Sequence, residues 1–331
     1  MPIQTTHATR FAALICASFI SSAGFLYAAL AANDPFRQEE TRPIGQKTTQ
    51  AFESLFEQGN YPDANWYLEQ AESEETNEPM VYAMLAAFSY QKENWSDLKS
   101  YADKTLETAQ RLADTDDQLR GNLYLAIGHF LQGGHILATE GNLKGAPQAL
   151  QKLQDVFNHL DKAQEINASD PELNLIKGYM DLLLSLNLPF SSPEAAITTL
   201  ESGSPSYLVN RGIALAYRDL GKTQQALEFI NKAIAETPDN PEVLYLKAQI
   251  LDSLGRKNKD SVQLTQAKEN FSKALQRPEQ LPKRLVAQIF YEQCKNLNRI
   301  DQQKRPCDPR RDQIKAFQGN WGPTADRMPD L

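Results

Sequence analysis

The sequence contains few of the residues that build metal and catalytic sites. Among 331 residues there are three cysteines and four histidines. None of them has partners at metal-ligand spacing, so we expect no metal and no cofactor. The glycine-rich loops of nucleotide-binding proteins, the GxSxG of hydrolases and the HExxH of zinc proteases are also missing. These absences argue against an enzyme, and the formal net charge of −8 argues against a nucleic-acid partner.

Long segments that alternate apolar and polar residues are missing as well, which leaves no convincing β-strand. The chain instead carries amphipathic helical patterns, several of which start with Asp, Ser or Asn followed by Pro and Glu. Proline suits the first turn of a helix, and an acidic residue there faces the positive end of the helix dipole. These signals predict an all-α fold with helices that begin at Pro171, Pro193 and Pro241.

Residues 207–240 carry the clearest pattern in the chain, two amphipathic helices that meet at a turn. Small residues are expected to let the helices approach closely, and a glycine is expected to end the first helix in the left-handed conformation. The pattern resembles the tetratricopeptide repeat, a helix–turn–helix unit of 34 residues. The residues that carry this resemblance are Ala214, Tyr217, Gly221, Ala226, Ile230, Ala233 and Pro238.

One such unit cannot bury its apolar face alone, so the resemblance implies neighbours stacked into an α-solenoid. We expect the array to cover 45–280, in the units 45–78, 79–112, 116–170, 171–206, 207–240 and 241–280. The unit 116–170 is atypical, because its predicted helices, Asp116–Thr139 and Gln148–Asn167, are unusually long. In 241–280 about seven extra residues, around 257–264, are expected to lengthen the turn. Residues 281–299 are predicted to form a capping helix, and 300–331 a polar tail.

The N-terminal segment is the second informative feature. Phe11–Ala32 has no charged residue, and 22 helical residues would reach ~33 Å, enough to cross a bilayer. We expect residues 1–32 to be either an uncleaved signal anchor, preceding the solenoid as an apolar helix, or a signal peptide cleaved near Ala31. Residues 33–44 would then be a polar tether. Either alternative predicts a repeat domain on the periplasmic or lumenal side, anchored to the membrane or secreted.

Two cysteines remain beyond the N-terminal segment, Cys294 and Cys307, 13 positions apart. In an exported protein they could form a disulfide that holds the tail on the last helix. The alternative is a pair of unrelated free thiols.

The resemblance implies a function carried by surfaces. In tetratricopeptide proteins the first helices of successive hairpins line a concave groove that holds a peptide or a partner helix. We therefore expect a non-catalytic scaffold that binds proteins during the assembly or maintenance of a membrane or envelope complex. The alternatives are an enzyme with a site around 116–206 and a self-assembling structural module. The partner and the oligomeric state stay open. The predicted groove positions are Met84, Tyr90, His129, Gln132, Tyr179, Arg211, Arg218, Tyr245 and Gln249.

Overall fold

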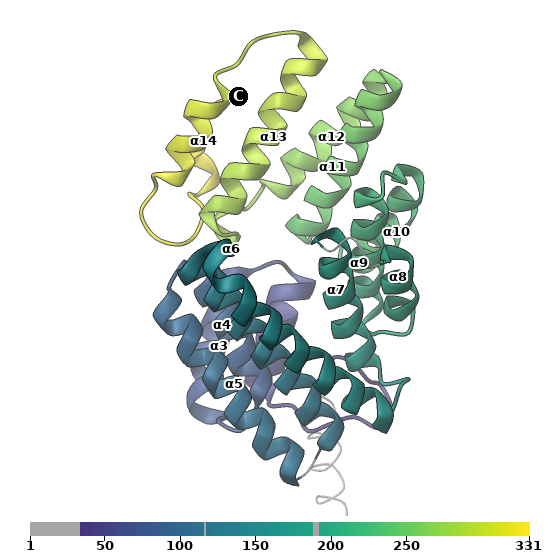
Figure 1. Ribbon diagram of the computed structural model, residues 1–331. Coiled ribbons are helices and arrows are strands. Elements are labelled where there is room, and N and C mark those ends of the chain that lie inside the picture. Colours follow the sequence, from purple (N-terminus) through teal and green to yellow (C-terminus); the bar gives the residue numbers. More distant parts are fainter. Residues whose placement is uncertain (1–33, 116, 188–191) are drawn as a thin grey trace, which may run out of the picture.

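The computed structural model describes residues 34–115, 117–187 and 192–331. These residues form helices that pack as successive hairpins (Figure 1), which confirms the predicted all-α solenoid. The apolar segment predicted at 1–32 lies outside the described residues. No helix within the described residues is both long and apolar enough to cross a bilayer.

The elements follow one another along the array, and the predicted helix starts at Pro171, Pro193 and Pro241 are confirmed. In chain order they are α2 (Gln46–Phe52), η1 (Glu53–Glu57), α3 (Tyr61–Glu74), α4 (Pro79–Gln91), α5 (Trp95–Thr115), α6 (Gln118–Ile166), α7 (Pro171–Asn187), α8 (Pro193–Glu201), α9 (Ser206–Asp219), α10 (Thr223–Glu236), α11 (Pro241–Asn258), α12 (Ser261–Ala274), η2 (Pro278–Gln280), α13 (Lys283–Asp301), α14 (Cys307–Lys315) and η3 (Ala325–Arg327).

The α9–α10 hairpin packs through small side chains. Ala214 on α9 and Ala226 on α10 are both fully buried, so nothing larger than a methyl group separates the helices there. Gly221 follows the end of α9 with a φ of 69°, a left-handed conformation in which glycine carries no Cβ penalty. The rings of Tyr217 and Phe229 lie 5.6 Å apart across the same hairpin.

The atypical unit is a long hairpin that lies within α6. The helical course breaks at Gly141, where φ is 77° and ψ is 164°. The two halves run back along each other, since the rings of His129 and His159 stack with their centroids 5.5 Å apart. Gly128 faces α5 so closely that a Cβ would lie 2.6 Å from Leu106 Cδ2. A small residue at this position therefore sets the approach of α5 and α6.

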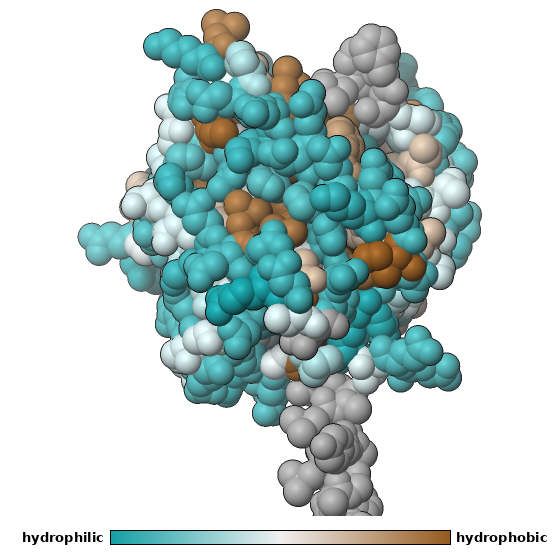
Figure 2. Space-filling view, turned by 60° about the horizontal axis from the view of Figure 1, so that its bottom comes forward, coloured by the Kyte–Doolittle hydropathy of each residue, from teal (hydrophilic) through white to brown (hydrophobic). Residues whose placement is uncertain are grey.

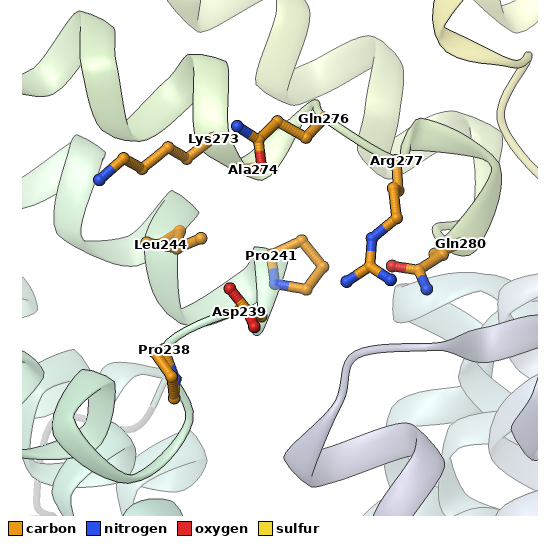
Figure 3. A pocket seen from close by; sticks show the side chains of 9 residues that line it. All are labelled: Pro238, Asp239, Pro241, Leu244, Lys273, Ala274, Gln276, Arg277 and Gln280. Carbon is orange, nitrogen blue, oxygen red and sulfur yellow. The ribbon is translucent and has the colours of Figure 1, made fainter.

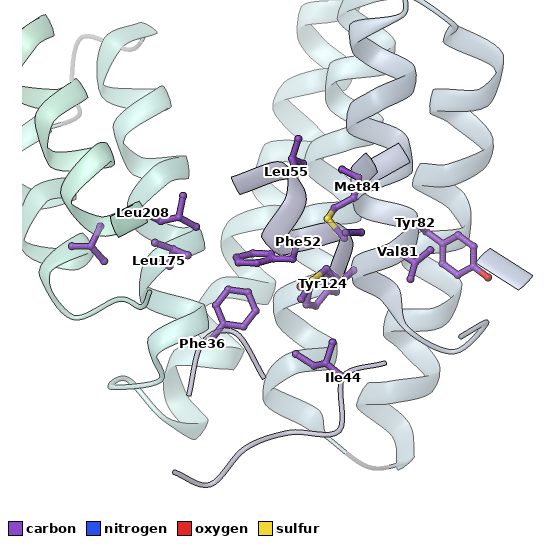
Figure 4. Packing of buried hydrophobic residues seen from close by; sticks show 14 of the residues in the cluster. Phe36, Ile44, Phe52, Leu55, Val81, Tyr82, Met84, Tyr124, Leu175 and Leu208 are labelled. Carbon is purple, nitrogen blue, oxygen red and sulfur yellow. The ribbon is translucent and has the colours of Figure 1, made fainter. Parts of the chain in front are cut away.

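Three segments differ from the sequence-based expectation. The turn expected to be long around 257–264 is short, because α11 continues to Asn258 and α12 starts at Ser261. The polar tail expected at 300–331 contains α14 and packs against the array through Trp321. Residues 34–44, expected to be a tether, pack against the helices: Phe36 is 4% exposed and its ring lies 5.1 Å from that of Phe52 (Figure 4).

A buried cluster of charges holds this N-terminal segment in place. Arg37 donates to both carboxylate oxygens of Asp170 at 2.7 Å, and Arg42 pairs with Asp117 at 2.6 Å. Glu172, whose side chain is fully buried, lies within 3.5 Å of both guanidinium groups. The charges that made this segment appear solvated are matched by opposite charges on α7 and at the start of α6.

Arg120 on α6 extends the cluster into the core. Its guanidinium donates to the carboxylate of Glu78 at 2.8 and 2.9 Å and to Glu172 at 3.2 Å. The hydroxyl of Tyr124 donates to Glu172 at 3.0 Å. One network of charge-assisted hydrogen bonds therefore joins α6 to the starts of α4 and α7.

The array curves far enough for its first hairpin to contact a later one. Asn240, which caps α11, donates through Nδ2 to the carbonyl oxygens of Phe56 and Glu57, both at 3.0 Å. Gly59 has a φ of 64°, and a Cβ on it would lie 2.7 Å from Pro241. These two elements are more than 180 residues apart in sequence, so the contact closes the array on itself.

The C-terminal part adds two more contacts to the first hairpins. The ring of Trp321 lies 6.4 Å from that of Tyr61 and 6.3 Å from that of Phe88. Arg284 on α13 forms an ion pair with Glu93, which lies in the turn between α4 and α5. In Figure 1 the yellow hairpin α13–α14 accordingly lies next to the blue hairpins rather than at a free end.

Candidate partner-binding groove

A polar groove of about 530 Å³ lies between α9, α11 and α13. These are the first helices of three successive hairpins, so the groove runs across the array. Arg218 on α9 and Gln249 on α11, 31 residues later, face each other across it. The lining residues are Arg218, Asp219, Gln249, Asp252, Ser253, Arg256, Tyr291, Glu292, Lys295 and Arg299.

Hydrogen bonds from helix to helix form one wall of the groove. Arg218 Nη1 donates to Gln249 Oε1 at 2.7 Å, and Gln249 Nε2 donates to Glu292 Oε2 at 3.0 Å. Tyr245 donates its hydroxyl to Glu292 Oε1 at 2.8 Å. Burial and the Glu292 carboxylate both raise the pKa of Tyr245, so it remains a neutral donor. The ladder fixes the side chains in place before any partner arrives, which lowers the entropy cost of binding.

An ion pair centred on Asp252, one helical turn after Gln249, also connects α11 to α13. Asp252 accepts from Arg256 at 2.9 Å, from Arg299 at 3.0 Å and from the buried amide of Asn296 at 2.9 Å. Four cationic and three anionic side chains line the groove in total. Because the charges nearly balance, the groove suits a polar or mixed-charge segment better than a strongly acidic or basic one.

Two of the predicted groove residues are engaged elsewhere within the fold. Arg211 forms an ion pair with Glu242, which also accepts from the hydroxyl of Tyr61 on the first hairpin. Tyr179 donates its hydroxyl to the carbonyl oxygen of Leu208 at 2.8 Å, and burial raises its pKa to about 12. These side chains hold neighbouring hairpins together at the point where the array closes.

The remaining predicted positions lie away from this groove. Met84 is 6% exposed and packs in the core near Phe52 (Figure 4). Tyr90 is 54% exposed, with its ring 5.7 Å from that of Trp95. The other two lie on the first half of α6, where His129 stacks on His159 of the second half and Gln132 donates to Asp103 on α5.

The structure therefore gathers Arg218, Tyr245 and Gln249 and separates the other six. Sequence reasoning missed Asp219 on α9, Asp252, Ser253 and Arg256 on α11, and every lining residue on α13, a helix that was treated only as a cap for the core. The sequence carried a signal for α13, because Glu292, Lys295 and Arg299 follow one another at helical spacing.

A disulfide lies behind the α13 wall. Cys294 on α13 and Cys307 at the start of α14 are bonded, with their Cα atoms 5.7 Å apart, and both side chains are buried. It holds α14 against α13, and Lys295 reaches Asp308 on α14 at 3.7 Å. Within the described ranges no group of three His, Cys, Asp or Glu side chains is arranged to hold a metal ion.

Comparisons with known proteins give a local match. Residues 212–240 match the tetratricopeptide repeat family, and these residues cover most of the α9–α10 hairpin. No curated protein matches the chain. Among solved structures, the chain is similar to a human IFIT1 dimer with m7Gppp-AAAA, at 16% sequence identity and a TM-score of 0.45. That match covers 91% of this chain and 66% of the other.

Proposed function

We propose that the chain is a non-catalytic scaffold that binds a partner polypeptide in the groove between α9, α11 and α13, since its helices pack as successive hairpins and residues 212–240 match the tetratricopeptide repeat family. Repeats of this kind generally serve protein interactions. The observation that carries the proposal is the ladder of Arg218, Gln249 and Glu292, which organises an open polar groove on three consecutive first helices.

The lining residues suit a peptide held through its polar groups. Arginine and tyrosine, here Arg218 and Tyr291, are the residue types that contribute most at protein interfaces. Ser253 and Gln249 can donate to and accept from the main chain of an extended segment. The near balance of charge favours a partner segment with residues of both signs.

Affinity capture with the full chain, followed by mass spectrometry, would identify the partner, and a double variant would test the groove. We expect Arg218→Ala with Gln249→Ala to weaken the captured interaction ~30-fold or more, because truncating one interface anchor costs ~2 kcal/mol. The matched control is Lys232→Ala on the exposed face of α10. Retention of every partner at native strength by a folded double variant would place the binding surface elsewhere.

We further propose that the protein works at a membrane, in the assembly or maintenance of a membrane or envelope complex. The uncharged segment Phe11–Ala32 supports membrane attachment, and the Cys294–Cys307 bond suits an oxidising compartment outside the cytoplasm. Carbonate extraction of cell fractions tests the attachment. A mature chain that begins at Ala32 would select cleavage, and a full-length chain found wholly in the soluble cytoplasmic fraction would contradict both alternatives.

Self-assembly is a second candidate, favoured by the outer face of α6. Leu143, Leu150 and Phe157 recur at intervals of seven residues and are 96%, 56% and 40% exposed. Between them the only charged residues are Lys144 and the Lys152–Asp155 pair. Figure 2 shows a mostly hydrophilic face with scattered hydrophobic patches. This exposed apolar row could pack against the same row of a second copy. Light scattering of Leu150→Asp tests this: a wild-type chain that stays monomeric at high concentration would exclude it.

A further inference from the structure

A second pocket, of about 280 Å³, lies outside the groove and shares no lining residue with it. It is enclosed by the loop before α11, the end of α12 and η2 (Figure 3). Pro238, Pro241 and Leu244 form an apolar side. The volume is ample for a phosphate or carboxylate group together with the waters around it.

Cationic side chains on this pocket lack partners. Arg277 and Lys273 make no ion pair with any residue that the structure describes, whereas most arginines in the same ranges do. Lys247 on α11 lies near Lys273, and burial together with that neighbouring charge lowers the pKa of Lys247. The positive charges of Arg277 and Lys273 are therefore not neutralised by ion pairs within the described part of the chain.

The opposite side carries one carboxylate. Asp239 lies across the pocket from Lys273 and Arg277 (Figure 3), and it forms no ion pair with the described residues. Two amide side chains, Gln276 and Gln280, complete the polar lining. An anion bound beside Arg277 would thus meet donors on one side and an acceptor on the other, so a ligand that also carries a hydrogen-bond donor fits best.

We propose that this pocket binds an oxyanion, a carboxylate or a phosphate group, with Arg277 and Lys273 as its cationic partners and Asp239 accepting a hydrogen bond from the ligand. Two kinds of ligand supply such an oxyanion. One is inorganic phosphate or a phosphate ester, and the other is an acidic peptide, whose carboxylates lie next to main-chain N–H groups.

Isothermal titration calorimetry of the full chain at low salt tests the site with three probes: inorganic phosphate, inorganic sulfate and an acetylated, amidated glutamate peptide. Arg277→Gln should weaken binding ~10- to 100-fold, the equivalent of one or more charge-assisted hydrogen bonds. Lys268→Gln, an exposed change of the same charge on α12 outside the pocket lining, should weaken binding several-fold less than Arg277→Gln, because it removes no direct hydrogen bond to the ligand.

Asp239 gives the sharper test. Hydrogen phosphate carries a proton that Asp239 can accept in a hydrogen bond, whereas sulfate carries none, so phosphate should bind more tightly. Asp239→Asn should remove this preference, because an amide can donate to sulfate. Binding of phosphate alone assigns the phosphate source, and binding of the peptide assigns the carboxylate source. The proposal is overturned if no probe binds, or if Arg277→Gln and Lys268→Gln weaken binding equally.

Discussion

Replacement of Arg120 by methionine would test whether the buried charge cluster holds the N-terminal half of the array together. Arg120 is 3% exposed, and its guanidinium is the only cation bonded to Glu78 within the described residues. Methionine has a similar length and no charge, so the substitution removes the ionic partner and leaves only a small change in volume.

The expected loss follows from what remains behind. Glu78 would keep only its bond from the backbone N–H of Met80 at 2.9 Å, and Glu172 would keep Arg37, Arg42 and Tyr124. Breaking a buried ion pair by removing one partner costs ~3–5 kcal/mol, out of a total stability of ~5–15 kcal/mol. Arg120→Met should therefore lose a large share of the free energy of unfolding.

Urea unfolding followed by far-UV circular dichroism would measure this loss. The matched control is Glu228→Gln, which breaks the exposed pair with Lys232 and should cost ~0.3–0.5 kcal/mol. Adding Glu78→Gln to Arg120→Met should restore part of the loss, since the orphaned carboxylate is then neutral. A loss below ~1 kcal/mol for Arg120→Met would refute the reasoning, because it would mean that the cluster is hydrated or replaceable.

Three further predictions concern packing, pH and redox state. Ala226→Leu should overpack the α9–α10 hairpin and cost ~1–3 kcal/mol in thermal unfolding; an unchanged unfolding midpoint would contradict the assigned register. Burial and nearby lysines lower the pKa of His129 and His159 below the ordinary 6.5. Their contribution to stability is therefore present above pH 6.5 and declines as pH falls below it, and His159→Gln should reduce the pH dependence of the unfolding free energy. Alkylation without reduction, read by mass spectrometry, should leave Cys294 and Cys307 unmodified. Alkylation of both cysteines would contradict the disulfide.

The features that the sequence predicted best are those set by neighbouring residues. The hairpin at 207–240 follows from spacings of a few residues, and the starts of α7, α8 and α11 follow from proline at the first helical position. The break in the atypical unit at Gly141 is likewise local, and it falls between the two helices expected there. Such signals require no knowledge of the rest of the chain.

Long-range pairing was not predictable in this way. Arg37 finds its partners 133 and 135 residues away, so in the sequence alone residues 34–44 have the composition of a solvated tether. The closure through Asn240 determined which groove positions were left open, since Asn240 caps α11, and Glu242 on α11 pairs with Arg211 on α9. Only Arg218, Tyr245 and Gln249 lie beyond this closure, where the groove remains accessible.

The contact of the first hairpin with Asn240 also bears on how the molecule unfolds. In an open solenoid each hairpin touches only its neighbours, so stability is a sum of local terms and the ends fray independently. Here Asn240, Trp321 and Arg284 connect late elements to early ones, so neither end can detach without breaking contacts far along the chain. The array should therefore lose structure in larger cooperative units, with its first and last hairpins protected from hydrogen exchange to a similar degree. Folding requires these distant segments to meet. We therefore expect the chain to fold more slowly than all-helical proteins whose contacts are mostly local.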